Sequence, residues 1–303
     1  LREPPPPRKA RTSMDFFFSQ LLNGLSAGTV YALLAVGYSL VYSILQQINF
    51  AHGYVYMFGV FVLMSMTAGG APLWLGIITA LAVGAVLAIL IEYFAYRPVR
   101  GNRLAPTVTA VGVGLIIENV ARLIWGSQIR PLPFPLQGIV WQVGPVVITP
   151  LQLIVLGTGL LMAGILWFIS NKMNIGRAMR AVRDDLPTSE LMGIPVNRVI
   201  TFVYVLGAVF GVAGGILFGA YYNRIDVGMG FFGTLNAFTA TIIGGIGSIW
   251  GAFAGGLLLG VVQALVTGYL GGALLNTVTF ALLILFLLVK PNGLAGVKVV
   301  NRV

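Results

Sequence analysis

The sequence contains no cysteine and only one histidine, His52, among its 303 residues. The lack of cysteine excludes disulfides, thiolate chemistry and cysteine-ligated metals, and a single histidine excludes a histidine-based metal cluster. No phosphate-binding loop of the G-x-x-x-x-G-K-S/T type is present, and no serine, histidine and aspartate set can be assembled around His52. These absences disfavour an enzyme and predict a chain that binds no metal or cofactor of its own.

Charged residues are also scarce, at 9% of the sequence against roughly 25% in soluble domains. With 58% hydrophobic residues and a mean hydropathy of +0.94, the composition predicts an all-α polytopic membrane protein in contact with lipid. The net charge is +10, but the basic residues are scattered among short segments, which argues against nucleic-acid binding. By the positive-inside rule, we expect residues 97–103, residues 171–199 and the C-terminus in the cytoplasm.

The apolar tracts predict eight to ten membrane segments, since a spanning helix needs about 20 residues. They form a single transmembrane domain over residues 14–303, preceded by a Pro-rich tail, residues 1–13, that we expect to be disordered and without a central role. The first tract is longer than one span needs, so we expect a break near Asn23-Gly24. Three simple spans before Arg97 would place the amino terminus outside, against the charge of the tail, and the sequence leaves the side of the N-terminus open.

Two further patterns concern loops and packing. In the predicted outer loop, the run GIVWQVGPVVI indicates a small β-hairpin, and we expect this loop and residues 223–230 to receive a binding protein. Glycines recur at four-residue spacing, as in Gly24/Gly28 and Gly256/Gly260. In lipid, small residues at this spacing let helices approach closely, so they predict a tightly packed bundle.

Polar breaks at membrane depth are tolerated only inside protein or beside a water-filled path. QQINFAHG, residues 46–53, and GGIGSIWG, residues 244–251, are two such breaks, and helix ends exposed there can bind a polar or zwitterionic solute. The residues we assign to a substrate path are Asn49, His52, Gly53, Glu118, Thr239, Gly244 and Gly245. His52 can instead bond a neighbouring helix carbonyl for structural reasons.

Charges inside predicted spans have two interpretations. Glu118 and Arg122 are four residues apart and can form an ion pair on one helix. The pair can meet the two ends of a zwitterion, or it can be structural near the outer interface. We expect Glu92 to pair with Arg97 at the cytoplasmic interface.

Residues 171–199 form the longest charged segment between two hydrophobic tracts, with five basic and three acidic residues. Ile175, Met179 and Val182 recur at helical spacing and predict an amphipathic helix whose apolar face fills a groove in another protein. Pro187 should break the run, and Thr188 or Ser189 should cap a second turn. The alternative is a solvated connector.

Several motifs together resemble the permease subunits of bacterial branched-chain amino acid ABC importers of the Liv type, nearer the LivH-like member. These are NGLSAGTVYALLAVGYSLVYSILQQINFAHG, YRPVRGNR, GRAMRAVRDDLPTSELMGI, GGIGSIWGAFAGGLLLG and KPNGLAG, in matching order over residues 14–297. The resemblance implies transport of branched-chain or other amino acids across the bacterial inner membrane. Relatives that carry urea or short-chain amides leave the solute open.

The resemblance also implies partners. These are a homologous second permease, two cytoplasmic ATPase subunits that bind ATP, and a periplasmic solute-binding protein. The residues matching the ATPase-contacting loop are Ile175, Gly176, Arg177, Met179, Arg180, Val182, Arg183 and Gly193. A stand-alone channel or ion-coupled carrier is the competing class, but such a carrier generally needs titratable groups at the midplane, and this chain has few besides Glu118.

Overall fold

The computed structural model describes residues 13–102, 104–143 and 146–295. The predicted Pro-rich tail, apart from Ser13, and the basic residues Lys298 and Arg302 lie outside this part of the chain. The described helices and strands, in chain order, are α1 (Ser13–Leu45), α2 (His52–Ala68), α3 (Leu73–Leu90), a π-helical turn η1 (Ile91–Tyr96), a 3-10 turn η2 (Arg97–Val99), α4 (Ala105–Trp125), β1 (Trp141–Val143), β2 (Val146–Ile148), α5 (Pro150–Lys172), α6 (Asn174–Asp184), α7 (Leu186–Leu191), α8 (Val196–Tyr222), α9 (Met229–Gly244), α10 (Ile249–Tyr269), a 3-10 turn η3 (Gly272–Leu274) and α11 (Leu275–Val289).

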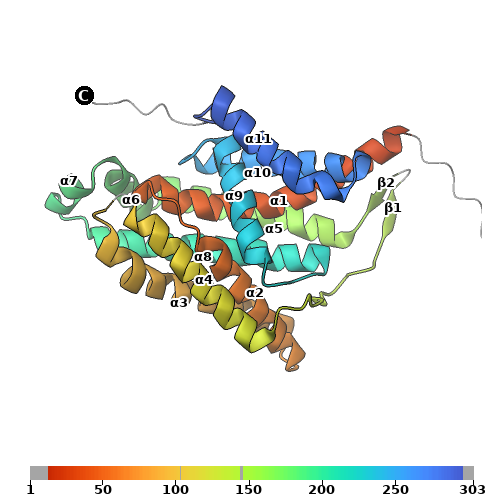
Figure 1. The fold of residues 1–303 in the computed structure, drawn as a ribbon, viewed down its shortest axis with the longest axis horizontal. Helices are drawn as coiled ribbons and strands as arrows, with labels where there is room; N and C mark the ends of the chain where they lie inside the picture. Colours follow the sequence, from red (N-terminus) through yellow and green to blue (C-terminus); the bar gives the residue numbers. More distant parts are fainter. Residues whose placement is uncertain (1–12, 103, 144–145, 296–303) are drawn as a thin grey trace, which may run out of the picture.

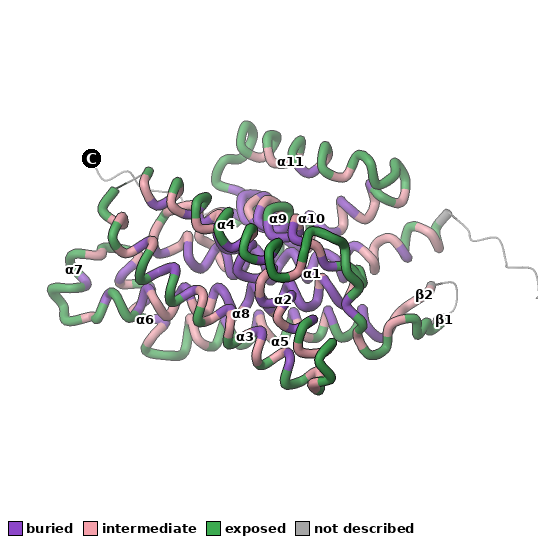
Figure 2. Tube along the Cα trace, turned by 60° about the horizontal axis from the view of Figure 1, so that its bottom comes forward, coloured by how far each residue is buried: buried purple, intermediate pink, exposed green. Residues whose placement is uncertain are grey.

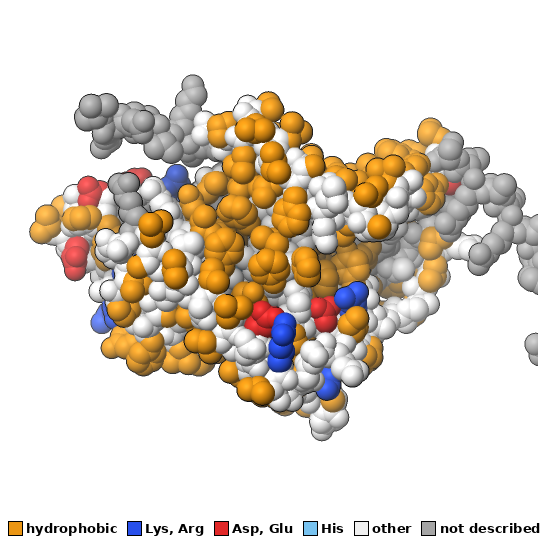
Figure 3. Space-filling model, in the orientation of Figure 1, with side chains coloured by type: hydrophobic (Ala, Val, Ile, Leu, Met, Phe, Trp, Pro, Cys, Tyr) orange, Lys and Arg blue, Asp and Glu red, His pale blue; other side chains and the backbone are white. Residues whose placement is uncertain are grey.

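The helices form a bundle with a buried centre and an exposed outer layer (Figures 1 and 2). α1, α2, α8 and α9 are largely buried, whereas α3, α4, α5 and α11 turn large apolar side chains outward. Hydrophobic side chains cover most of the face seen in Figure 3, with few charges among them. In water such a surface would drive aggregation, so it indicates contact with lipid or with other membrane helices.

The number of apolar helices in the described chain agrees with the predicted number of membrane segments. In the described chain, seven helices are long and apolar enough to span a membrane, and the two apolar helices α2 and α9 are shorter. These nine helices fall within the predicted eight to ten, and the prediction of an all-α polytopic membrane protein with one small hairpin is confirmed.

The first helix differs from the prediction. α1 is one continuous helix of 33 residues with no break at Asn23-Gly24. Its glycines serve packing, because a Cβ on Gly24 would lie 2.6 Å from the Val261 Cα of α10. Further along the same crossing, a Cβ on Gly260 would lie 2.1 Å from the Gly28 Cα. The four-residue glycine spacing therefore marks a close helix crossing, as predicted for this kind of pattern.

The two predicted breaks both interrupt the helices. Between α1 and α2 the chain is irregular over residues 46–51, and Gln46 has a φ of 52°. Between α9 and α10 it is irregular over residues 245–248, where Gly245 and Gly247 have positive φ. These conformations favour glycine, which explains the GGIGS run at the second break.

The two ends of the molecule differ in structure. At one end β1 and β2 form the predicted antiparallel hairpin, with Gln142 opposite Val147. Nearby, Arg130 and Ile225 join two loops through a pair of backbone hydrogen bonds of 2.9 Å each. At the opposite end lie α6 and α7 (Figure 1).

The start of α1 lies at the hairpin end. The Gln152 amide at the start of α5 donates to Asn23 Oδ1 at 2.8 Å, and α1 contacts β2. Helices α1, α2 and α3 precede η1 and η2, and Arg100, just after η2, donates to Asn197 at the start of α8, the helix that follows α7. The start of α1 therefore lies at the end of the molecule opposite α6 and α7 (Figure 1). Residues 1–12, and with them the side of the N-terminus, lie outside the described residues.

Candidate functional site: a buried polar break and a two-helix loop

The segment before α2 is held by one local hydrogen bond and one from a distant side chain. Asn49 Oδ1 accepts hydrogen bonds from the Ala51 backbone at 3.0 Å and from the Tyr96 hydroxyl at 2.7 Å. Both Asn49 and His52 are buried, at 7% and 4% exposure. The polar break is therefore an ordered part of the core, as expected for irregular backbone inside a membrane protein.

His52 fits tightly between two helices. A Cβ on Gly37 of α1 would lie 3.1 Å from the imidazole, and a Cβ on Gly211 of α8 would lie 2.9 Å from it. The imidazole ring forms one hydrogen bond with the Leu34 backbone. Its buried Nε2 atom has no hydrogen-bond partner among the described residues. The histidine thus combines the structural bond expected of it with one polar atom left free.

A small cavity adjoins this histidine, lined by Val41, Asn49, Ala51, His52, Val55, Ala88, Ile91, Tyr204 and Ala208. It has room for about one water molecule. An amino acid does not fit, so in this conformation the polar break is closed to an organic solute.

Gly53 brings the first turns of the two short helices together. A Cβ on Gly53 would lie 1.9 Å from Thr234 Oγ1 and 2.1 Å from the Gly230 carbonyl oxygen, both on α9. In the next turn of α2, the Tyr56 hydroxyl donates to the Met229 carbonyl. The start of α2 is therefore fixed against the start of α9 by contacts that only glycine permits.

The other residues assigned to a substrate path lie elsewhere. Thr239 is fully buried on α9 and donates to its own helix at Leu235. Gly244 and Gly245 pack at the C-terminal end of α9, where a Cβ on Gly293 would lie 2.4 Å from the Gly245 Cα. None of these three lines the cavity beside His52, where only Asn49 and His52 of the assigned residues meet. Gly53 follows His52 in the chain but packs against α9.

Glu118 and Arg122 form the predicted ion pair on α4. The Glu118 side chain is 13% exposed and also takes a hydrogen bond with Tyr54, whereas Arg122 is 51% exposed. Trp125, at the end of the same helix, donates to Ser65 Oγ at 2.6 Å. Both interpretations of the pair, structural and solute-binding, remain predictions.

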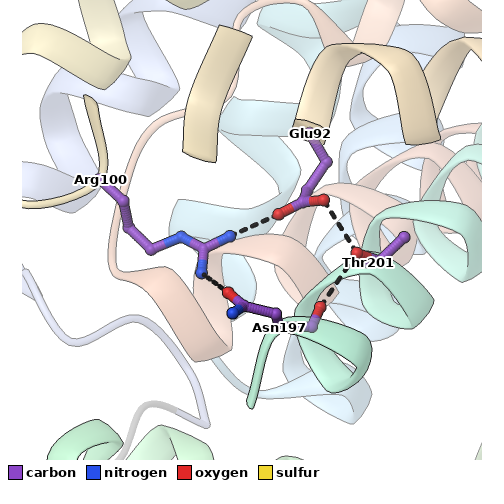
Figure 4. Close-up of polar contacts among 4 residues, drawn as sticks. All are labelled: Glu92, Arg100, Asn197 and Thr201. Carbon is purple, nitrogen blue, oxygen red and sulfur yellow. Dashed lines mark hydrogen bonds and ion pairs between the residues drawn. The ribbon is translucent and has the colours of Figure 1, made fainter. Parts of the chain in front are cut away.

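Glu92 has a different partner from the one predicted. Its carboxylate pairs with Arg100 and also accepts from the Thr201 hydroxyl at 2.8 Å (Figure 4). Arg97 instead lies over the Tyr93 ring, 5.3 Å from its centroid. The sequence suggested the nearest arginine, but η1 and η2 replace regular α-helix here, and Thr201 arrives from α8, which no local spacing indicates.

The predicted two-helix loop is present as α6 and α7. Asp185, rather than Thr188 or Ser189, caps α7, because its carboxylate accepts from the Thr188 backbone N–H at 2.8 Å. This bond lowers the pKa of Asp185 below its usual value. Pro187 stands in the first turn of α7, where its missing N–H costs nothing, and Gly193 ends the segment with a φ of 82°.

The apolar face of α6 points inward, which corrects the expectation that it fills a groove in another protein. Met179 and Val182 are 6% and 1% exposed and pack within the chain's own core, with Ile175 against its edge. Gly176 permits this packing, because a Cβ there would lie 2.2 Å from the Ser170 carbonyl oxygen. Arg180 fixes the same turn by donating to that carbonyl.

The exposed apolar residues of the loop follow α6 instead. Leu191 and Met192, between the end of α7 and Gly193, are 87% and 78% exposed. Arg177 is exposed and donates to Asn174, and Arg183 is partly exposed. The spacing of apolar residues identified α6 correctly, but it could not indicate which protein the apolar face contacts.

Comparison with known proteins places the chain in a family. The sequence profile described as "Branched-chain amino acid transport system / permease component" matches residues 20–289. The chain belongs to this permease family. The "High-affinity branched-chain amino acid transport system permease protein LivH" of Escherichia coli is 39% identical over 304 residues, covering 95% of this chain and 98% of the relative. The resemblance found in the sequence is thereby confirmed.

Two more similarities complete the comparison. The "High-affinity branched-chain amino acid transport system permease protein BraD" of Pseudomonas aeruginosa is 39% identical, covering 95% of this chain and 98% of the relative. A solved structure, "PsaBC from Streptococcus pneumoniae in complex with Fab", aligns with a TM-score of 0.49 and 15% identity over 91% of this chain and 92% of that one. The curated relatives are named as transport permeases and not as enzymes, and this permease is a multi-pass membrane protein.

Proposed function

We propose that this permease is the membrane-spanning subunit of an ATP-driven importer for branched-chain amino acids in the bacterial inner membrane. The observation that carries the proposal is its 39% identity, over nearly the whole of both chains, to relatives named as high-affinity permeases for these solutes. The chain has no phosphate-binding loop of its own, so ATP must act on separate subunits. A homologous second permease completes the transmembrane part.

The two ends of the molecule suit two different partners. The α6–α7 end carries the basic loop residues together with exposed Leu191 and Met192, and it is the end where two cytoplasmic ATPase subunits would dock. The opposite end carries the β1–β2 hairpin and the Arg130–Ile225 bridge, where a periplasmic solute-binding protein would dock. Arg224 and Asp226, paired at 3.1 Å beside that bridge, offer it both signs of charge.

Reconstitution tests the function. The permease, its partner permease, the ATPases and the binding protein are placed in liposomes, and uptake of labelled leucine is followed with and without ATP. We expect uptake that requires ATP and is competed by isoleucine and valine. Competition by urea or acetamide instead would assign the amide-transporting role, and uptake by the permease alone would indicate a channel or secondary carrier.

The orientation can be tested with single cysteines, since the native sequence has none. Thr188→Cys in α7 and Ser127→Cys after α4 are both exposed. Ser127 is three residues before Arg130, which forms the bridge with Ile225 after α8. In intact cells we expect a membrane-impermeant maleimide to label Ser127→Cys and to leave Thr188→Cys unlabelled until the membrane is opened. The reverse pattern would invert the proposed topology.

A further inference from the structure

A buried ion pair connects the two-helix loop to the polar break. We propose that Glu92, Arg100, Asn197 and Thr201 form a joint that transmits movement of the α6–α7 loop to Asn49 and His52, and that they are positioning residues for transport. The inference rests on the proposed function, because it assumes that partner subunits move the loop. The inference adds to that function the chain of contacts by which movement of the loop reaches the buried polar break.

Both carboxylate oxygens of Glu92, the acidic residue of the joint, have partners. Glu92 is 1% exposed, and its two carboxylate oxygens are bound by different segments, one by Arg100 and the other by the α8 hydroxyl of Thr201 at 2.8 Å (Figure 4). Arg100 in turn donates to Asn197 Oδ1 at 3.0 Å. A buried carboxylate is strongly unfavourable unless it is paired and hydrogen-bonded, so these bonds hold the three segments together in this conformation.

On the loop side the connection is short. Asn197 and Thr201 belong to the first two turns of α8, which follows α7 after a tight turn at Gly193 and Pro195. Met192 and Ile194 are hydrogen-bonded back to α7 at Thr188 and Ser189, both at 3.0 Å. A displacement of α7 therefore moves the start of α8 rather than being absorbed by a loose linker.

On the interior side the connection runs through η1. Glu92 stands in the first turn of this π-helical segment, and Tyr96 ends it. Tyr96 packs its ring 5.3 Å from Tyr204 of α8 and donates its hydroxyl to Asn49 at 2.7 Å. Ile91, at the start of η1, lines the cavity together with Asn49 and His52.

The chemistry of the joint favours a role in movement over a purely structural one. A well-packed apolar cluster usually stabilises a protein as well as a buried ion pair does, so stability alone does not explain two charges here. Arg100 Nε is buried without a hydrogen-bond partner among the described residues, which leaves this guanidinium a donor for a second arrangement. Polar contacts of this kind can exchange between two discrete states, which is what a transmitted conformational change requires.

The test uses the complete complex in liposomes and compares four variants. Glu92→Gln and Arg100→Gln remove one charge each, Thr201→Val removes only the hydroxyl bonded to Glu92, and Arg97→Gln is the matched control. Arg97 is three residues from Arg100, and its side chain lies over the Tyr93 ring. Its backbone N–H donates to the Glu92 carbonyl oxygen, a bond that the glutamine substitution leaves in place. The measured quantities are assembled complex, ATP hydrolysis without solute, and leucine transported per ATP hydrolysed.

We expect Glu92→Gln and Arg100→Gln to lower the leucine transported per ATP by roughly tenfold or more, within the usual range of coupling between two sites. Thr201→Val should act in the same direction with a smaller effect, and Arg97→Gln should match the wild type. Hydrolysis without solute should persist, because the ATPases remain bound.

Two results would contradict the proposal that these residues transmit the movement. One is an unchanged amount of leucine transported per ATP in both Thr201→Val and an assembled Glu92→Gln variant. The other is an equal loss in Arg97→Gln. If Glu92→Gln fails to assemble, Thr201→Val decides the question by itself, because valine keeps the shape of threonine. Failure of the proposed function is distinct, since the wild-type complex would then show no ATP-dependent leucine uptake at all.

Discussion

Replacing both Leu191 and Met192 by aspartate is expected to abolish recovery of the proposed ATPase subunits with the permease and to leave the permease itself folded. These side chains are 87% and 78% exposed, and no part of the described chain covers them. Burying two such side chains at an interface contributes roughly 3–6 kcal/mol. Their loss corresponds to about a 10²- to 10⁴-fold weaker complex, before the cost of burying the new charges.

Copurification of tagged permease with the ATPases measures this effect, and two matched variants define it. Leu136→Asp changes a 42% exposed leucine near the other end and should leave recovery unchanged. Met179→Asp should instead lower the yield of folded permease, because Met179 is 6% exposed inside the protein. Full recovery of ATPases with the double aspartate variant would show that the partner is bound by another surface.

The second large effect is expected at the contact between α2 and α9. Gly53→Ala should lower the free energy of unfolding by about 3 kcal/mol or more, at the upper end of what overpacking costs. The new Cβ would lie 1.9 Å from Thr234 Oγ1 and 2.1 Å from the Gly230 carbonyl. Those two atoms are hydrogen-bonded to each other at 2.8 Å, so neither can withdraw without breaking that bond.

Thermal unfolding of the detergent-solubilised permease measures this loss. Gly112→Ala is the control, because a Cβ there meets nothing within 4 Å, and alanine should stabilise that helix slightly. Adding Thr234→Ala to Gly53→Ala removes one clashing atom and leaves the carbonyl, so recovery should be partial. A melting temperature for Gly53→Ala equal to that of the wild type would contradict the contact between the two helices.

Features with local sequence signals were predicted well. The two polar breaks, the hairpin around Gln142 and the helices of the loop each depend on residues close together in the chain, where composition and periodicity decide the outcome. The glycine spacing also predicted close packing. The supposed break at Asn23-Gly24 was wrong because glycine in lipid serves helix contact as readily as it ends a helix.

Features that depend on distant segments were missed. Ile175, Met179 and Val182 define an apolar face, but the sequence does not say whether α8 or another protein covers it. Glu92 meets Thr201 across more than one hundred residues of chain, which no local spacing indicates. Its charged partner, Arg100, is only eight residues away, but the π-helical and 3-10 turns bring it to Glu92 in place of Arg97. In both cases the tertiary fold, rather than local pattern, chooses the contact.

The crossing of α1 and α10 has a consequence for how the molecule varies and moves. At Gly28 and Gly260 the two main chains meet with no side chain between them, so the separation of the helix axes does not depend on rotamers. Adjustment by side-chain repacking, which lets other helix pairs shift by small amounts, is not open to this one. The separation of α1 and α10 is therefore fixed. The lipid-facing helices can change in sequence and in tilt around this fixed pair.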